Sequence, residues 1–314
     1  MPERQFIERV RRLAGKETRR SLIHGIGDDC GVLQVPAGSQ LLVTTDLCIE
    51  GVHFRREWHS ADCVGHRCLA RGLSDIAAMG GEPVACFLSL GLPAQLPKKW
   101  IDGFLRGMLR LAGQFRAPLA GGDTSSAGKI MADIVVLGTV PASQAVLRSG
   151  ARPGDSVYVT GDLGGSAAVL KSFYGKKAIA AGSAHRHFYP VPRVEVGRWL
   201  RRKKLASAMI DVSDGLSVDL AHICQESRVA AVMEESAIPI AQGATLDSAL
   251  HGGEDYELLF TAPPKASLPP KIADVAVTKI GEIKPQSSGR YAIQIRDQAG
   301  RLKPVKPKGW QHFR

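Results

Sequence analysis

The sequence predicts an α+β protein of two domains, and three observations lead to this prediction. The chain has 314 residues, two to three times the usual span of one domain. Strand-like and helix-like segments alternate without a long series of β-α-β units, which favours α+β halves over a doubly wound sheet. Segment 141–155 combines prolines, glycines and small polar residues directly after an apolar run. We therefore expect an N-terminal domain at 1–142 and a C-terminal domain at 148–314.

The first half of the chain reads as three strands and two helices. Apolar, β-branched runs predict strands at 41–45, 85–90 and 130–136. Helices are expected at 61–79 and 98–115. In the second of these, apolar residues recur at helical spacing and form one face: Ile101, Phe104, Leu105, Met108, Leu109, Ala112 and Phe115.

The second half opens with a strand at 156–160 that leads through a glycine-rich turn into a helix. Further strands are expected at 229–234, 256–261, 275–280 and 291–295, and helices near 192–201 and 216–227. Residues 184–193 contain His185 and His187 and read as a loop ahead of a helix.

Composition indicates an ordinary globular protein with a cytoplasmic address. Apolar residues make up 44% and charged residues 23% of the chain. No apolar run reaches the ~18 residues of a membrane span, and the polar N-terminus has no apolar signal core. The six cysteines form no CxxC pair and are too sparse for a disulfide framework. We expect reduced thiols and no membrane partner.

The net charge of +11 is concentrated in three basic clusters, at 1–20, 198–204 and 301–314. These clusters lack interleaved aromatics, which are 6% of the chain, and no nucleic-acid-binding motif is present. We interpret them as solvated faces or as attraction for small anions, with no nucleic-acid partner. A non-catalytic RNA-binding protein is the alternative, but it leaves the acidic residues described next without a role.

A set of acidic residues stands in short turns flanked by glycine or hydroxyl residues: Asp28, Asp29, Asp46, Asp75, Asp123, Asp211, Asp214, Glu254 and Asp255. Most of them abut apolar segments, where clustered carboxylates repel one another and lose hydration unless cations are present. Mg²⁺ prefers oxygen ligands and is usually held by a few carboxylates together with substrate phosphates. The chain has no HExxH and no Walker lysine motif. The pattern therefore predicts Mg²⁺-dependent phosphoryl chemistry.

Two glycine-rich elements favour a nucleotide as the phosphate donor. The sequence AGGDTS at 120–125 lets backbone N–H groups approach an anion closely. The sequence TGDLGGS at 160–166 leads from a strand into a helix and is suited to an anion nest at the helix N-terminus, although many such loops are simple turns. Arg148 is a candidate phosphate clamp.

Taken in order, the segments GIGDDC, TTD…GVHF, LSDIAAMGGEP, GGDT, RSGARPGD, IDVSDGL and GGEDYEL, with GWQHF near the end, resemble the thiamine-monophosphate kinase family. That family belongs to the ATP-binding superfamily of aminoimidazole ribonucleotide synthetase. The resemblance implies a homodimer whose N-terminal domains pair their sheets into a β-barrel, and an active-site cleft completed by the C-terminal domain. It also implies ATP-dependent phosphorylation of thiamine monophosphate to thiamine diphosphate by direct in-line transfer.

The resemblance implies a role for each matching residue. Several Mg²⁺ ions would be held by Asp29, Thr44, Thr45, Asp46, Asp75, Asp123, Asp211 and Asp214, with Asp28 close by. Catalysis would centre on Asp46, Asp123 and Asp211. ATP would contact Gly122, Asp123, Arg148 and Ser213, and thiamine phosphate would contact His53, Glu254 and Trp310. Taken alone, His53 also reads as a loop histidine and Trp310 as a C-terminal anchor.

Three positions depart from the family pattern, and two related activities compete with this interpretation. Thr44 replaces a common serine and keeps the hydroxyl. Arg71 and Gly72 stand where an apolar residue and an asparagine are expected, which puts any ligand role of position 72 in doubt. Another enzyme of the superfamily would use ATP to activate an amide or a selenium donor. A selenophosphate synthetase needs a reactive cysteine in a glycine-rich N-terminal stretch, and neither Cys30 nor Cys48 has that setting.

Overall fold

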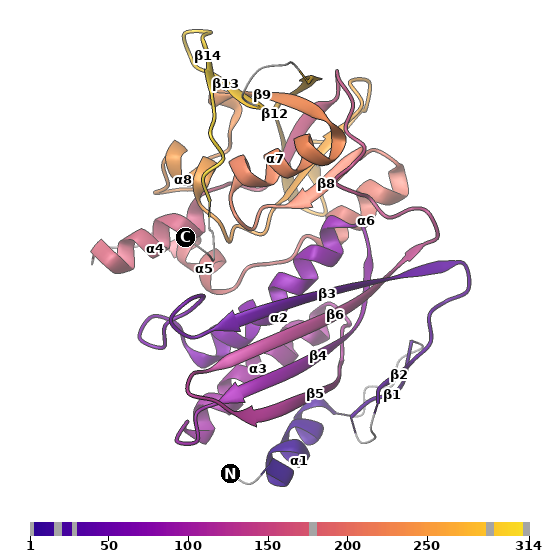
Figure 1. The fold of residues 1–314 in the computed structure, drawn as a ribbon, viewed down its shortest axis with the longest axis vertical. Coiled ribbons are helices and arrows are strands. Elements are labelled where there is room, and N and C mark those ends of the chain that lie inside the picture. The colour runs from indigo at the N-terminus through magenta and orange to yellow at the C-terminus, as the bar shows by residue number, and fades with distance from the viewer. Residues whose placement is uncertain (1–2, 16–20, 27–29, 176–180, 287–291, 310–314) are drawn as a thin grey trace. The chain divides into compact units, whose positions relative to one another are not determined.

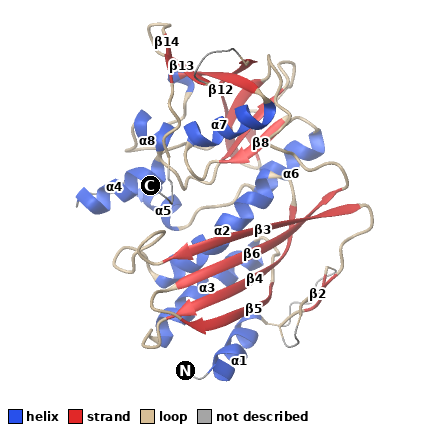
Figure 2. Ribbon diagram, viewed as in Figure 1, coloured by secondary structure: helices blue, strands red, loops and turns tan. Residues whose placement is uncertain are grey.

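The computed structural model describes residues 3–15, 21–26, 30–175, 181–286 and 292–309. The chain forms two compact units, which we describe separately (Figure 1). Unit 1 comprises residues 1–76, 81–144 and 188–190, and unit 2 comprises 77–80, 145–187 and 191–314. Both units combine helices and sheets (Figure 2), so the predicted two-domain α+β class is confirmed. The domain limits given above stay predictions.

Unit 1 is built on a four-stranded sheet in the order β3-β6-β4-β5. Strand β6 is antiparallel to both of its neighbours, and β5 is parallel to β4. Helices α2 and α3 lie behind this sheet (Figure 1). The elements are α1 (Glu3–Ala14), β1 (Leu22–His24), β2 (Val32–Leu33), β3 (Ser39–Ile49), α2 (Ala61–Ala78), β4 (Glu82–Leu92), α3 (Lys98–Gln114), β5 (Leu119–Ser126) and β6 (Met131–Pro141).

The period-2 alternation of β3 determines which of its side chains meet α2. Thr44 and Asp46 point to the helix side, where each contacts an α2 residue. Leu41, Val43 and Leu47 point the other way and are 45%, 59% and 42% exposed. The core lies on the helix side, between the sheet and the apolar faces of α2 and α3. One face of this sheet is thus buried, and the open face exposes several apolar side chains.

Unit 2 contains a mostly antiparallel sheet in the order β14-β13-β9-β12-β7-β10-β8, with β11 paired to β12. Helix α7 packs on this sheet and contacts α8. The elements are β7 (Ser156–Thr160), α4 (Gly165–Gly175), α5 (Ala181–Phe188), α6 (Val194–Lys203), β8 (Ala208–Asp211), α7 (Leu216–Ser227), β9 (Val229–Glu234), a 3₁₀ turn (Glu235–Ala237), α8 (Leu246–His251), β10 (Leu258–Ala262), β11 (Lys271–Ile272), β12 (Val275–Pro285), β13 (Ile293–Arg296) and β14 (Leu302–Pro304). Among the helices described in either unit, none combines the length and the apolar character needed to cross a membrane.

Two sequence predictions of loops are wrong. The glycine-rich stretch 120–125 lies inside β5, because the backbone of Gly122 passes very close to β4. A Cβ at Gly122 would stand 1.9 Å from the carbonyl oxygen of Leu88. The glycine therefore permits the close pairing of β5 with β4. The stretch 184–193, expected to be a loop, begins inside helix α5, and the chain leaves that helix just before Pro190.

Candidate active site

In unit 1, β3 and α2 bring four polar side chains together. Thr44 and Asp46 are two residues apart on one face of the strand, and Arg71 and Asp75 are four apart on one face of the helix. Thr44 Oγ1 donates a hydrogen bond to Asp75 Oδ2 at 2.5 Å. A guanidinium nitrogen of Arg71 lies 3.0 Å from Asp46 Oδ1. Thr45 points to the opposite, exposed face of the sheet.

Asp123 does not join this group within unit 1. Asp46 is on β3 and Asp123 is on β5, the two edge strands of the sheet, with β6 and β4 between them. Three strand spacings separate the two backbones by ~14 Å. The Asp123 carboxylate instead accepts a hydrogen bond from the N–H of Thr124 at 2.7 Å. It borders a pocket of about 90 Å³ lined mainly by apolar residues of α1, β4 and β5.

The donors near Asp75 have the right chemistry for Mg²⁺ but do not form a closed cage. Thr44, Asp46 and Asp75 offer hard oxygen atoms. Within the described part of the chain, no three His, Cys, Asp or Glu side chains form a metal-binding group. Mg²⁺ is usually held through one or two carboxylates, with water and phosphate oxygens completing its shell, so the residues present fit it. Burial raises the pKa of the nearby Cys68 well above its usual range, which keeps this thiol protonated.

In unit 2, the 211–215 loop joins β8 to α7 and carries two of the predicted acids. Asp211 is buried at the end of β8, and Asp214 is half-buried. The shape of the loop is held by Asp219, whose Oδ2 accepts the backbone N–H groups of Ser213, Asp214 and Gly215 at 3.2, 3.3 and 3.0 Å. Burial raises the pKa of Asp219 well above its usual range, and the charges of Asp211 and Asp214 raise it further.

The 252–257 segment runs alongside this loop. The N–H of Glu254 donates to the carbonyl of Ser213 at 2.8 Å, and that of Tyr256 donates to Val212 at 2.9 Å. Glu254 and Tyr256 have φ values of 64° and 52°, a left-handed conformation that is uncommon outside glycine. Such a backbone persists only where the surroundings hold it. The segment therefore presents Glu254 beside Ser213 in a conformation that other contacts must maintain.

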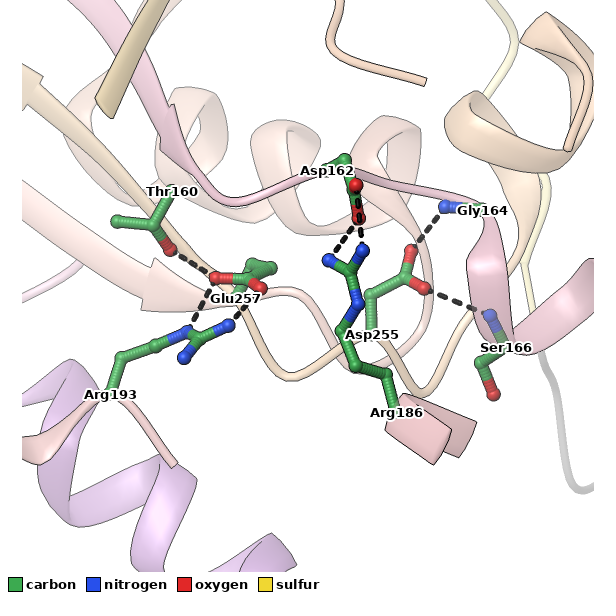
Figure 3. A network of polar contacts seen from close by, with 8 residues as sticks. All are labelled: Thr160, Asp162, Gly164, Ser166, Arg186, Arg193, Asp255 and Glu257. Atoms are coloured by element: carbon green, nitrogen blue, oxygen red, sulfur yellow. Dashed lines mark hydrogen bonds and ion pairs between the residues drawn. The ribbon is translucent and has the colours of Figure 1, made fainter. Parts of the chain in front are cut away.

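Those contacts come from Asp255 and Glu257, which directly follow Glu254 and Tyr256 in the sequence (Figure 3). Although Asp255 is only partly buried as a residue, its carboxylate points inward and accepts the N–H groups of Gly164 and Ser166 at 2.7 and 3.3 Å. Glu257 accepts Arg193 Nε at 2.7 Å and the Thr160 hydroxyl at 2.6 Å. The N-terminus of α4, which we predicted as an anion nest, is thus already filled by a carboxylate of this chain.

The 305–309 tail passes over the start of α7. Lys308 N–H donates to Ser217 Oγ at 3.2 Å, and Ser217 Oγ is also 2.9 Å from His251 Nδ1. A Cβ at Gly309 would stand 2.5 Å from the carbonyl oxygen of Asp214, so the tail touches the 211–215 loop directly. The next residue in the chain is Trp310, which lies outside the described residues, as do Asp28 and Asp29.

His53 and Arg148 take separate places. His53 lies in the turn after β3, where its Nδ1 accepts the N–H of Ile49 at 3.0 Å, leaving Nε2 to carry the ring proton of the neutral form. Arg148 is exposed ahead of β7, and its backbone oxygen accepts the Ser227 hydroxyl at 2.9 Å.

Comparison with known proteins gives a consistent result over both units. Residues 27–140 match the family described as AIR synthase related protein, N-terminal domain, and residues 152–299 match its C-terminal domain. The thiamine-monophosphate kinase of Salmonella typhimurium is 38% identical over 290 residues, covering 88% of this chain and 85% of that protein. That of Bacillus subtilis is 36% identical over 307 residues, covering 92% and 93%. The chain belongs to the thiamine-monophosphate kinase family.

Solved structures agree with this assignment. The thiamine-monophosphate kinase of Stenotrophomonas maltophilia is 35% identical and superposes with a TM-score of 0.81, covering 94% of this chain and 96% of that one. AaThiL complexed with AMPPCP and TMP is 31% identical with a TM-score of 0.79, covering 99% and 97%. Hydrogenase maturation protein HypE, at 16% identity and a TM-score of 0.79, shares the fold.

The family motifs of this chain were visible in the sequence, but their supporting residues were not. Asp219 carried one signal, an acid in the first turn of a predicted helix. Arg193 and Glu257 are 64 positions apart, and nothing local joins them. The sequence marks Arg71 as a departure from the family pattern but does not indicate its partner Asp46. Sequence reasoning thus found the motif residues and missed the groups that orient them.

Proposed function

We propose that this protein transfers the γ-phosphoryl group of ATP to the phosphate of thiamine monophosphate, giving thiamine diphosphate in one Mg²⁺-assisted in-line step. The observation that carries the proposal is the structural similarity to AaThiL complexed with AMPPCP and TMP. This similarity extends over 99% of the chain. These two ligands correspond to a phosphate donor and an acceptor that already bears a phosphate. The carboxylates in units 1 and 2 would suit two such anionic reactants through bound Mg²⁺, which offsets the repulsion between carboxylate and phosphate.

In unit 1, the group around Asp75 would hold the metal. Bound Mg²⁺ would neutralise the phosphate charge that builds up during transfer. The Thr44 hydroxyl orients the Asp75 carboxylate by donating to one of its oxygens. Asp46 is next to this pair on β3. From the family motifs we also assign Asp29, Thr45 and Asp123 to Mg²⁺. Because Thr45 and Asp123 lie apart from the Asp75 group, they would hold other ions of the several expected. Gly122 and Asp123 are assigned to ATP.

In unit 2, the 211–215 loop and the 252–257 segment would bind the reactants. We assign Asp211 and Asp214 to Mg²⁺ and Ser213 to ATP. Glu254 would contact thiamine phosphate, and its backbone bond to Ser213 keeps the two substrate contacts in fixed relation. Trp310, attached to the tail beside Asp214, would stack on the cationic thiamine ring. We assign Arg148 to ATP and His53 to thiamine phosphate.

We further propose that the protein acts as a cytoplasmic homodimer. Its six cysteines are free thiols, as expected of a reducing compartment. The open face of the unit 1 sheet exposes Leu41, Val43 and Leu47 on β3 and Met131 on β6. Exposed apolar residues gathered on one face of a sheet favour burial against a second copy through the same surface.

The direct test is an assay of the purified protein with ATP, Mg²⁺ and thiamine monophosphate. We expect thiamine diphosphate and ADP in equal amounts, and no product when Mg²⁺ is chelated. Asp46→Asn should lower turnover by about 10²–10³-fold, the usual loss for one transition-state charge contact. Free thiamine should be a poor acceptor because it lacks the phosphate on which the metal acts. Phosphorylation of thiamine as efficient as that of its monophosphate would overturn the proposal.

A further inference from the structure

Arg71 occupies an unusual position beside the candidate metal group. Its side chain is 17% exposed and that of Asp46 is 21% exposed, so their 3.0 Å ion pair is largely removed from solvent. The neighbouring Gly72 explains how α2 comes so near the sheet. A Cβ at Gly72 would stand 2.6 Å from Val136 Cγ2 on β6, and the absence of that Cβ lets the helix settle against the strands.

Arg71 offsets part of the negative charge of this group. Asp46 and Asp75 bring two carboxylates to the same side of the sheet, and partial burial makes such a pair unfavourable without a cation. The guanidinium supplies a positive charge from within the chain. It engages Oδ1 of Asp46, one of the oxygen atoms that a divalent cation would use. The guanidinium takes one of the lone pairs open to a metal ion, and its positive charge repels a divalent cation at Asp46.

We propose that Arg71 is a built-in counter-ion that occupies Asp46 until a divalent cation arrives, so that metal binding here is a displacement of Arg71. The proposal rests on the assignment of Asp46 to Mg²⁺ made above. It makes Arg71 a positioning residue that weakens metal binding in the nucleotide-free protein. Mg²⁺ delivered with nucleotide phosphates brings extra contacts that offset the lost ion pair. Occupation of this group would therefore be coupled to the arrival of ATP.

The test measures metal binding without nucleotide, using Mn²⁺ as a paramagnetic substitute for Mg²⁺ and electron paramagnetic resonance to count free Mn²⁺. Arg71→Met removes the charge and keeps an unbranched side chain. We expect Mn²⁺ to bind this variant more tightly, by on the order of 10-fold, a typical coupling between neighbouring charged groups. The metal-free variant should have a lower melting temperature than the metal-free unmodified protein. Excess Mg²⁺ should reduce the difference between the two melting temperatures. Unchanged or weaker Mn²⁺ binding would overturn the proposal.

Two further variants keep the result interpretable. Arg71→Lys retains the charge and should bind Mn²⁺ within about 3-fold of the unmodified protein; a gain equal to that of Arg71→Met would contradict the counter-ion role. Arg110→Met is the matched control. It breaks a more exposed ion pair, 2.8 Å between Arg110 and Asp62, at the other end of α2. Thirteen helical residues, ~20 Å, separate Asp62 from Asp75, so Mn²⁺ affinity should stay unchanged.

Asp46→Asn separates this inference from the function on which it rests. If Asp46→Asn leaves Mn²⁺ binding intact, Asp46 is not a metal ligand and the metal assignment itself fails, together with the displacement of Arg71. If Asp46→Asn weakens Mn²⁺ binding while Arg71→Met does not strengthen it, only the counter-ion role fails. Weakening in the first variant and strengthening in the second support both.

Discussion

Asp255 and Glu257 show how neighbouring acids can be buried by different means. Glu257 faces a guanidinium, that of Arg193, which offsets the loss of hydration with charge and two donors (Figure 3). Among the described residues, the hydrogen-bond donors to the Asp255 carboxylate are neutral N–H groups at the start of α4. Burial raises the pKa of Asp255 to about 7, and the charges of Glu257 and Asp162 add to the rise, against the lowering effect of Gly164 and Ser166. Its protonation state should therefore change near neutral pH.

This shift predicts that stability falls as pH rises. In the unfolded chain Asp255 loses its proton near pH 4, and in the folded protein near pH 7. Between these values the folded state binds the extra proton, so the free energy of unfolding decreases as pH increases through that window. Asp255→Asn cannot ionise and should lose this part of the dependence. Urea unfolding of both proteins at pH 5.0 and ~7.5 measures the difference.

Asp297 provides a control with the opposite sign. Hydrogen bonds from Lys303 and from Arg301 lower the pKa of Asp297 to about 2. Its contribution to stability is present above pH ~4 and is lost only as pH falls toward 2. Asp297→Asn should therefore leave the slope between pH 5 and ~7.5 as it is in the unmodified protein. An equal slope in Asp255→Asn and the unmodified protein would contradict the assignment to Asp255.

At the scale of elements, unit 2 brings three separate segments to one place. The 211–215 loop precedes α7, the 252–257 segment precedes β10, and the 305–309 tail follows β14. Backbone hydrogen bonds join the first two, and the Ser217 hydroxyl joins the tail to the first turn of α7. Because Ser217 also contacts His251 at the end of α8, one hydroxyl links the tail, α7 and α8. It is well placed to control the start of the segment that bears Trp310.

Ser217→Ala tests whether the tail positions Trp310 for the substrate. The change removes the acceptor of the Lys308 N–H and should raise the KM for thiamine monophosphate by about 2- to 10-fold, the value of one hydrogen bond, with little change for ATP. Trp310→Ala should raise the same constant. In the double variant the two effects should not add, because both act through the tail. Additive effects would mean that Ser217 acts elsewhere. If Trp310→Ala lowers the melting temperature but leaves the KM values for thiamine monophosphate and ATP unchanged, Trp310 is a structural anchor only.

At the scale of the whole molecule, the sequence predicts elements whose patterns are local and misses those decided by distant partners. Helix α7 begins and ends at the predicted residues 216 and 227, because its apolar periodicity is complete in itself. Strand β5 reads as a turn, since Gly, Asp, Thr and Ser favour turns, and only its pairing with β4 makes it a strand. The candidate site divides in the same way. The acids in short motifs can be identified from the sequence. The role of Arg193 cannot, because its partner Glu257 is 64 residues away.

The open face of the unit 1 sheet supports a prediction about assembly. Val43, at 59% exposure, is the most exposed of the apolar residues on this face. Under two-fold pairing of the sheets, Val43→Glu would place an unpaired charge in the interface, at a cost of several kcal/mol. We expect the dissociation constant of the dimer to rise by at least ~100-fold, measured by light scattering after gel filtration. The circular dichroism spectrum should stay unchanged. Val52→Glu is the matched control, since Val52 is 44% exposed but lies in the turn after β3, off this face. A monomeric unmodified protein, or equal dissociation of both variants, would contradict pairing through this sheet.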